Sequence, residues 1–146
     1  MEEVKREILD VKGGNIAKLN VTKGEDLAEL YAQDNRLEEL DLSANKKLEV
    51  LECSGNPLKF IRAVAPGSDG RDFINLEAGK GGYVSLRLAP GVQQYVAEAE
   101  EGFEFDGWYD ELGDRLGKDP VWNDTHGAGR TLVALSLIHI SEPTRH

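Results

Sequence analysis

Apolar positions in the first half of the chain recur every 21 residues, with Leu9, Leu30 and Leu51 marking the period. The columns that keep the same spacing are Val11, Ala32 and Cys53; Gly14, Asn35 and Asn56; Ile16, Leu37 and Leu58; and Leu19, Leu40 and Ile61. Self-similarity at a fixed period of this length indicates a repeat architecture, in which each unit buries its apolar face against its neighbours.

Each period divides into two half-units of the form L-x-x-L-x-L-x-x-N, as in residues 37–45 and 48–56. Alternate side chains of a strand share a face, so the two apolar residues of L-x-L are buried together. The asparagine follows where the chain must turn, and its amide can bond the turn's backbone. The pattern therefore predicts short strands, with Asn35, Asn45 and Asn56 in structural roles. A pair of amphipathic helices is the alternative, although columns of Asn and Gly disfavour helices.

These half-units resemble the leucine-rich repeats of bacterial cell-surface proteins, in the short-period form that has a strand-like segment on both sides of each coil. The resemblance covers about residues 8–65 and implies a solenoid of roughly two and a half coils over residues 1–66. Cys53 stands in an apolar column, so we expect a buried and unreactive thiol. Phe60, near the end of the repeats, is expected to pack against the segment that follows.

The second half of the chain has a different pattern, in which short alternating runs are separated by glycine-rich turns. A turn-forming segment at 66–70 ends the 21-residue period, and runs at 82–88, 95–99, 103–109 and 131–135 predict a small antiparallel sheet. We expect a linker over 67–79 and a second domain over 80–135. Trp108 is expected to anchor its core, because a tryptophan in so small a domain is normally buried.

The segment Gly102-Phe103-Glu104-Phe105-Asp106-Gly107-Trp108-Tyr109-Asp110, with its flanking strands, resembles the internalin B-repeat family. That resemblance implies a β-grasp-like module. The fold class expected from both halves is thus mainly β, with a short leucine-rich-repeat solenoid of 21-residue coils followed by a small β-grasp-like antiparallel domain.

The end of the chain, residues 136–146, resembles a translated sequencing-adapter artefact, and we expect a non-native tail without native function. Residues 135–140 nevertheless alternate well enough to extend the closing strand. If ordered, this segment could pair with a sheet edge of its own chain or of a neighbouring chain.

Charge and composition narrow the classes of partner. The 146 residues include 17 basic and 27 acidic side chains, giving a net charge of −10. Such an acidic chain, without a basic stripe, argues against nucleic acid as a partner. No apolar run approaches membrane-spanning length, and the first residues do not resemble a signal peptide. We expect no membrane insertion and, from the family resemblances, a fragment of a cell-surface or secreted bacterial protein.

Residues able to perform catalysis or bind metal are sparse. His126 is the one histidine outside the suspect tail, and no nucleophile motif accompanies it. A single cysteine without paired histidines gives no zinc site, and the acidic residues between 106 and 114 lack the spacing of a calcium loop. The sequence therefore predicts a protein that is not an enzyme and has neither metal nor cofactor.

Binding of a partner molecule is the remaining class of function. The candidate binding site consists of side chains that face outward from the strands of the repeats. One face is expected to present Asp10, Lys12, Tyr31, Gln33, Glu52 and Ser54, and the other Asn20, Thr22, Asp41, Ser43, Arg62 and Val64. Tyr31 is the lone aromatic of the first face, which suits an interface with a protein or glycan partner. An ordinary hydrated sheet surface is the alternative. At the level of the whole protein, the alternatives are a purely structural stalk and an accessory fragment of a larger secreted enzyme.

Overall fold

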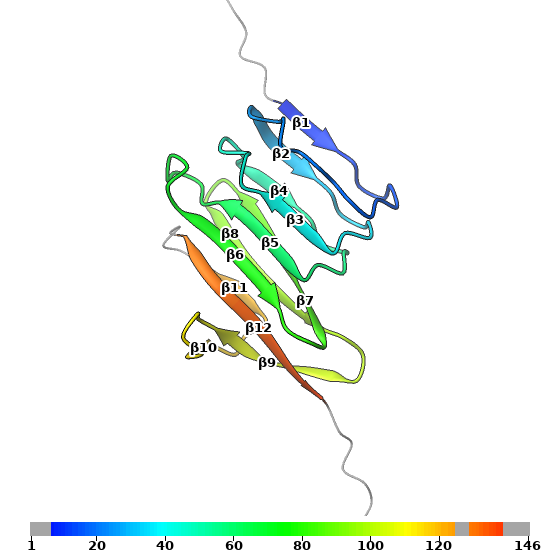
Figure 1. Ribbon diagram of the computed structural model, residues 1–146, viewed down its shortest axis with the longest axis vertical. Helices are drawn as coiled ribbons and strands as arrows, with labels where there is room; N and C mark the ends of the chain where they lie inside the picture. The colour runs from blue at the N-terminus through cyan, green and yellow to red at the C-terminus, as the bar shows by residue number, and fades with distance from the viewer. Residues whose placement is uncertain (1–6, 125–128, 139–146) are drawn as a thin grey trace, which may run out of the picture.

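A computed structural model describes residues 7–124 and 129–138. Regular structure within these residues consists entirely of β-strands (Figure 1). The strands are β1 (Glu7–Asp10), β2 (Leu27–Tyr31), β3 (Glu39–Leu42), β4 (Val50–Glu52), β5 (Phe60–Val64), β6 (Phe73–Ala78), β7 (Gly82–Ala89), β8 (Val92–Ala99), β9 (Phe103–Tyr109), β10 (Arg115–Gly117), β11 (Val121–Asn123) and β12 (Arg130–Ile138).

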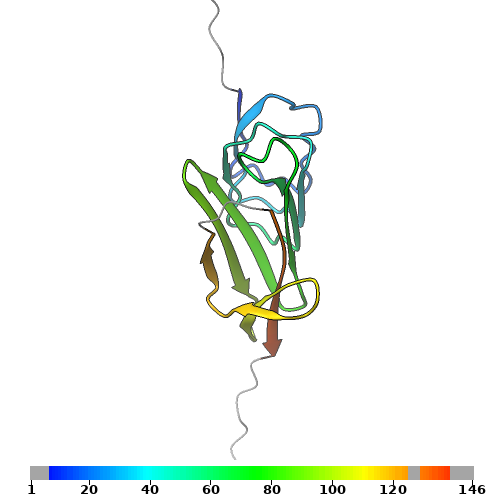
Figure 2. The ribbon, with the colours of Figure 1, turned by 90° about the vertical axis from the view of Figure 1, so that its left-hand side faces the viewer.

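The strands form two six-stranded mixed sheets, which pack face to face as two layers (Figure 2). Sheet A has the order β1-β2-β4-β7-β8-β11, and sheet B has the order β10-β9-β12-β6-β5-β3. Buried side chains from both sheets belong to one hydrophobic cluster, which runs from Val21 to Ala134 along the sequence. Burial of this shared apolar surface is the main force that holds the layers together.

The 21-residue period corresponds to the register between parallel neighbours. In sheet A, Leu9 pairs with Leu30 and Leu30 with Leu51, while in sheet B Leu40 pairs with Ile61. From β2 to β5 the chain alternates between the sheets, so each half-unit supplies one strand to one layer. The apolar columns consequently lie on the inner faces.

Asparagine side chains connect successive turns of this first half. Asn56 donates from Nδ2 to the carbonyl oxygens of Ala32 and Cys53 and accepts from the Leu37 amide, at 2.9, 3.0 and 3.0 Å. Asn35 makes the equivalent bonds one period earlier, and Asn45 donates to Val21 and Gly24. All three asparagines are buried. Each therefore supplies hydrogen-bond partners to backbone groups that would otherwise be buried without one.

Strands from the two halves of the chain pair directly with each other. β5 pairs antiparallel with β6 from Phe60↔Glu77 to Val64↔Phe73, and β4 pairs with β7 at Leu51↔Leu88. The predicted short solenoid followed by a separate β-grasp-like domain is therefore wrong, because both sheets are mixed and are shared by the two halves. The edges that a short stack of repeats would leave open are filled by β6 and β7, which satisfies their backbone groups.

The segments expected to be linker and tail also contribute strands. β6 lies within residues 67–79 and sits between β5 and β12 in sheet B. β12 extends into the presumed tail, where Ser136, Leu137 and Ile138 pair with β9. The remainder of the tail and His126 lie outside the described residues.

Two large aromatic residues, Tyr95 and Trp108, fill the core of the second half, and both are 0% exposed. Their rings meet edge to face at 6.3 Å, and Trp122 contacts Tyr95 in the same manner at 5.8 Å. Trp108 Nε1 donates to the carbonyl oxygen of Asp119 at 3.0 Å. The indole thus has its polar atom satisfied, as a buried tryptophan requires.

Candidate binding face

All six candidate binding residues lie on the outer surface of sheet A, which we call the sheet A face. Asp10, Tyr31 and Glu52 are successive Cα partners on β1, β2 and β4. Backbone hydrogen bonds from Gly13 to Gln33 and from Asp34 to Ser54 continue the same register. These bonds place a second row, consisting of Lys12, Gln33 and Ser54, beside the first.

The second half of the chain extends this face with polar residues that the sequence analysis did not select. Arg87 on β7 donates from Nε to Glu52 Oε1 at 2.9 Å. Its Cα partner on β8 is Gln94, whose amide donates to Asn123 on β11 at 2.8 Å. A polar row therefore crosses all six strands of sheet A, namely Asp10, Tyr31, Glu52, Arg87, Gln94 and Asn123.

A hollow of about 150 Å³ opens in this face where β4 and β7 meet. The polar residues around it are Glu52, Ser54, Asn56, Ser85, Arg87, Gln94 and Glu98. The apolar residues are Val96 and two members of the core, Val84 and Leu86, whose side chains are buried. The strands part here because their pairing is confined to Leu51 and Leu88, and the chain then turns at Gly55. Gly55 has a φ of 75°, and a Cβ there would lie 2.1 Å from Asp34 Oδ1. The turn that borders the hollow thus needs glycine.

Tyr31 and Gln33, which neighbour Glu52 and Ser54 on the sheet A face, differ in how their polar atoms are satisfied. The Tyr31 hydroxyl donates to Glu29 Oε1 at 2.5 Å, which fixes a ring that remains half-buried. Gln33 Oε1 is buried and has no hydrogen-bond partner within the described part of the chain. A buried acceptor without a partner costs ~1–3 kcal/mol, so Gln33 favours the arrival of a donor.

At the β1 end of the face, Asp10 and Lys12 form an ion pair of 2.6 Å. The hydrogen bonds from Lys12 to the Asp10 carboxylate hold the pKa of that carboxyl below its usual value. Both side chains are about half exposed, at 45% for Asp10 and 58% for Lys12. Solvent screens such a pair, so it contributes charge to the face more than stability.

Cys53 lies beneath the hollow and is 1% exposed. Its Sγ contacts the Leu86 carbonyl oxygen at 3.3 Å and Ser85 Oγ at 3.7 Å. Burial raises the pKa of the thiol. A neutral, inaccessible sulfur of this kind is a poor nucleophile.

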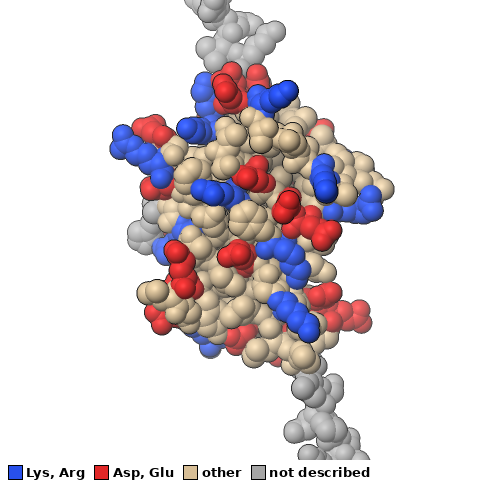
Figure 3. Space-filling model, in the orientation of Figure 1, with Lys and Arg blue, Asp and Glu red and all other residues tan. Residues whose placement is uncertain are grey.

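The outer surface of sheet B has a different character. Phe60, which was expected to pack against the second half, lies there between Glu39 and Glu77 and is only half-buried. Acidic and basic side chains are interspersed over this surface (Figure 3). A hollow of about 640 Å³ lies along β3 on this surface, and Lys18, Glu38, Glu39, Asp41 and Phe60 are among the residues that line it. Hydrogen bonds from Ser43 lower the pKa of Asp41, which keeps this rim anionic.

The alternation of apolar and polar residues could have identified Arg87 and Gln94 as outward-facing residues. Ser85, Arg87 and Gln94 occupy outward positions of two alternating runs, as Glu52 does on β4. Their proximity to Glu52 could not be predicted, because it depends on the pairing of β4 with β7 at Leu51 and Leu88, which are 37 positions apart in the sequence.

Features of two other classes of site, a metal centre and a membrane-spanning helix, are absent from residues 7–124 and 129–138. No group of three or more His, Cys, Asp or Glu side chains there is arranged to hold a metal ion. Nor do these residues include a helix with the length and apolar character needed to span a membrane. Comparisons with known proteins found no matching family, no similar curated protein and no similar solved structure.

Proposed function

We propose that this protein is a non-enzymatic recognition module that binds a glycan through the sheet A face. The observation that carries the proposal is the hollow between β4 and β7, which combines the half-buried apolar side chain of Val96 with hydrogen-bonding groups from both halves of the chain. A sugar ring presents hydroxyl groups that both donate and accept, together with apolar C–H surface. Carboxylate, guanidinium, amide and hydroxyl groups surround the hollow and match that mixture.

The size of the hollow supports a single sugar ring as its occupant. Pockets for whole small ligands are typically ~300–1,000 Å³, and about 150 Å³ is well below that range. The polar row on either side of the hollow would then contact neighbouring sugars of a longer chain. A protein partner is less well supported, because protein interfaces usually centre on apolar and aromatic side chains, whereas polar and charged side chains predominate around this hollow.

A structural stalk is the second candidate, and the shape of the molecule favours it. β1 and the end of β12 lie at opposite ends of the long axis (Figure 1). A spacer joined to neighbours at both ends would need that arrangement. In either case we place the protein at the bacterial cell surface or outside the cell, on the strength of its resemblance to B-repeat proteins over residues 80–135.

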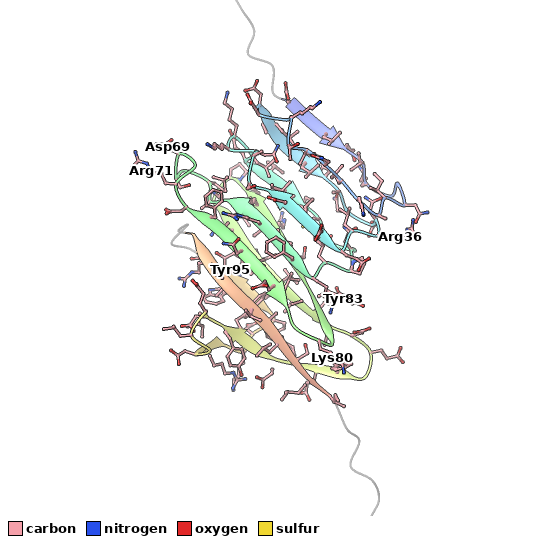
Figure 4. The ribbon with its side chains drawn as sticks, in the orientation of Figure 1. Arg36, Asp69, Arg71, Lys80, Tyr83 and Tyr95 are labelled. Atoms are coloured by element: carbon pink, nitrogen blue, oxygen red, sulfur yellow. The ribbon has the colours of Figure 1, made fainter. Side chains whose placement is uncertain are left out.

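The test is binding of the labelled full chain to an array of immobilised neutral and acidic oligosaccharides. Arg87→Ala removes the charged donor beside the hollow and should weaken capture by roughly tenfold or more, since hydrogen bonds to charged groups contribute ~1.5–3 kcal/mol. Arg71→Ala is the matched control. It removes the same charge from the exposed turn between β5 and β6 (Figure 4) and should leave binding unchanged. Failure of the unaltered protein to bind any oligosaccharide would exclude glycan recognition and favour the stalk.

A further inference from the structure

The end of the molecule at β1 exposes side chains whose repeat equivalents are buried. The equivalents in the second and third units are at most 1% exposed, namely Leu30, Ala32, Leu37, Leu40, Leu51, Cys53, Leu58 and Ile61. Leu9, Val11, Ile16 and Leu19 occupy the same columns in the first unit and are only partly buried. Within the described chain, no strand lies beyond β1 in sheet A. Among residues 7–124 and 129–138, nothing in sheet A therefore covers this end of the core.

The backbone at this end is also available for pairing. The Val11 amide donates to the Tyr31 carbonyl oxygen, so odd-numbered residues of this segment direct their backbone groups toward β2. Because N–H and C=O groups in a parallel pair alternate in direction from one residue to the next, those of Ile8 and Asp10 point away from β2. An exposed strand edge of this kind is a template for pairing with another strand.

A hollow of about 430 Å³ lies beside β1, and it is lined by Glu7, Ile8, Leu9, Asn20, Val21, Lys23, Gly24 and Leu27. Most of these side chains are apolar, and one acid and one base are the charged residues among them. Ile8 itself is 56% exposed. A protruding apolar side chain beside an apolar hollow makes the surface complementary to a second copy of itself.

We propose that two copies of this chain associate through β1, paired antiparallel across a two-fold axis. Ile8 of each copy enters the hollow of the other, and Glu7 of one faces Lys23 of the other. The strand edge of each copy is satisfied by the same edge of its partner, so association stops at a dimer.

A second copy fits this end better than a further repeat unit does. In the first half, Asn35, Asn45 and Asn56 each reach the preceding unit with their side-chain amides. Gly14 and Gly24 occupy the corresponding positions of the first unit. These glycines have no side-chain amide to donate to a preceding unit. The apolar hollow and the unpaired edge of β1 are still available to a second copy.

The test is the sedimentation behaviour of the full chain at micromolar to submillimolar concentrations. The expected species has twice the 16.1 kDa mass of one chain. Ile8→Glu should raise the dissociation constant by roughly tenfold or more, because two carboxylates would be brought together in an apolar contact. Leu137→Glu is the matched control, since Leu137 is 60% exposed on β12, and the dimer should persist.

A charge exchange provides an independent test with little risk to folding. Lys23→Glu should weaken the dimer by placing like charges opposite each other, and adding Glu7→Lys should restore it. A monomer at every concentration would overturn the proposal, as would a dimer insensitive to both Ile8→Glu and Lys23→Glu. Dissociation by Leu137→Glu rather than Ile8→Glu would also overturn it and would assign association to β12.

Discussion

Buried polar side chains organise this molecule at the scale of single residues. The asparagines of the first half could be predicted to lie at turns, because their spacing within each half-unit is fixed. The group formed by Tyr95, Asp124 and Arg130 could not be predicted. The Tyr95 hydroxyl donates to Asp124 Oδ2 at 2.7 Å, and Arg130 Nε donates to the same oxygen at 2.9 Å. This group joins β8 to β12 through contacts that bring together residues far apart in the sequence, which a local pattern does not reveal.

Because of Tyr95, the free energy of unfolding should depend on pH in the alkaline range. Burial, reinforced by the hydrogen bond to the Asp124 carboxylate, raises the pKa of its hydroxyl above the ordinary value of 10.0. The folded state therefore retains a proton that the unfolded chain releases above about pH 10. The resulting stabilisation is complete below that pH and is lost as the pH rises further, by up to ~1.4 kcal/mol per pH unit.

The measurement is urea unfolding of the protein and of Tyr95→Phe between neutral and strongly alkaline pH. The unaltered protein should lose stability more steeply than Tyr95→Phe as the pH rises. Tyr83 and Tyr109 also have raised pKa values, but they are present in both proteins and so do not affect the comparison. Parallel pH profiles would show that Tyr95 does not couple folding to proton release.

At the scale of elements, the sequence predicted strands and their register within the first half better than it predicted the connection between halves. The 21-residue spacing is the pairing register of β2 with β4 and of β3 with β5. Residues 66–70 were interpreted as a domain boundary, whereas they form the turn that reverses β5 into β6. Turn-forming residues mark both kinds of site, and only the long-range pairing distinguishes them.

β12 pairs with β6 through residues 130–134 and with β9 through residues 133–138, and this arrangement gives a prediction about the presumed tail. Ending the chain after Leu135 removes the pairs that Ser136, Leu137 and Ile138 make with β9 but keeps the whole register with β6. Leu137 and Ile138 are 60% and 61% exposed, so little apolar burial is lost. The truncated chain should unfold in one cooperative transition, destabilised by less than ~2 kcal/mol.

Leu132→Ala is the comparison for this truncation, because Leu132 is 1% exposed on the same strand. That substitution should cost ~2–5 kcal/mol through the cavity it leaves. Chemical denaturation followed by tryptophan fluorescence measures both effects. Loss of cooperative unfolding in the truncated chain would mean that residues 136–138 complete the core.

At the scale of the whole molecule, the sharing of both sheets by the two halves creates the candidate site. Glu52 comes from the repeats and Arg87 and Gln94 from the second half, and they meet only because β4 pairs with β7. The same sharing leaves one end of the core, at β1, uncovered by any described strand. The hollow proposed for recognition lies between β4 and β7, whereas self-association would use β1 at the edge of the same sheet.

Glycan binding at the junction of the two halves is tested most directly by amide chemical-shift mapping. The isotope-labelled chain would be titrated with the oligosaccharide that the array selects. The largest shifts are expected at the backbone amides of Glu52 and Arg87, with smaller ones at Gln33 and Gln94. Shifts confined to sheet B around Phe60, or no shifts with any oligosaccharide tested, would contradict binding at the sheet A face.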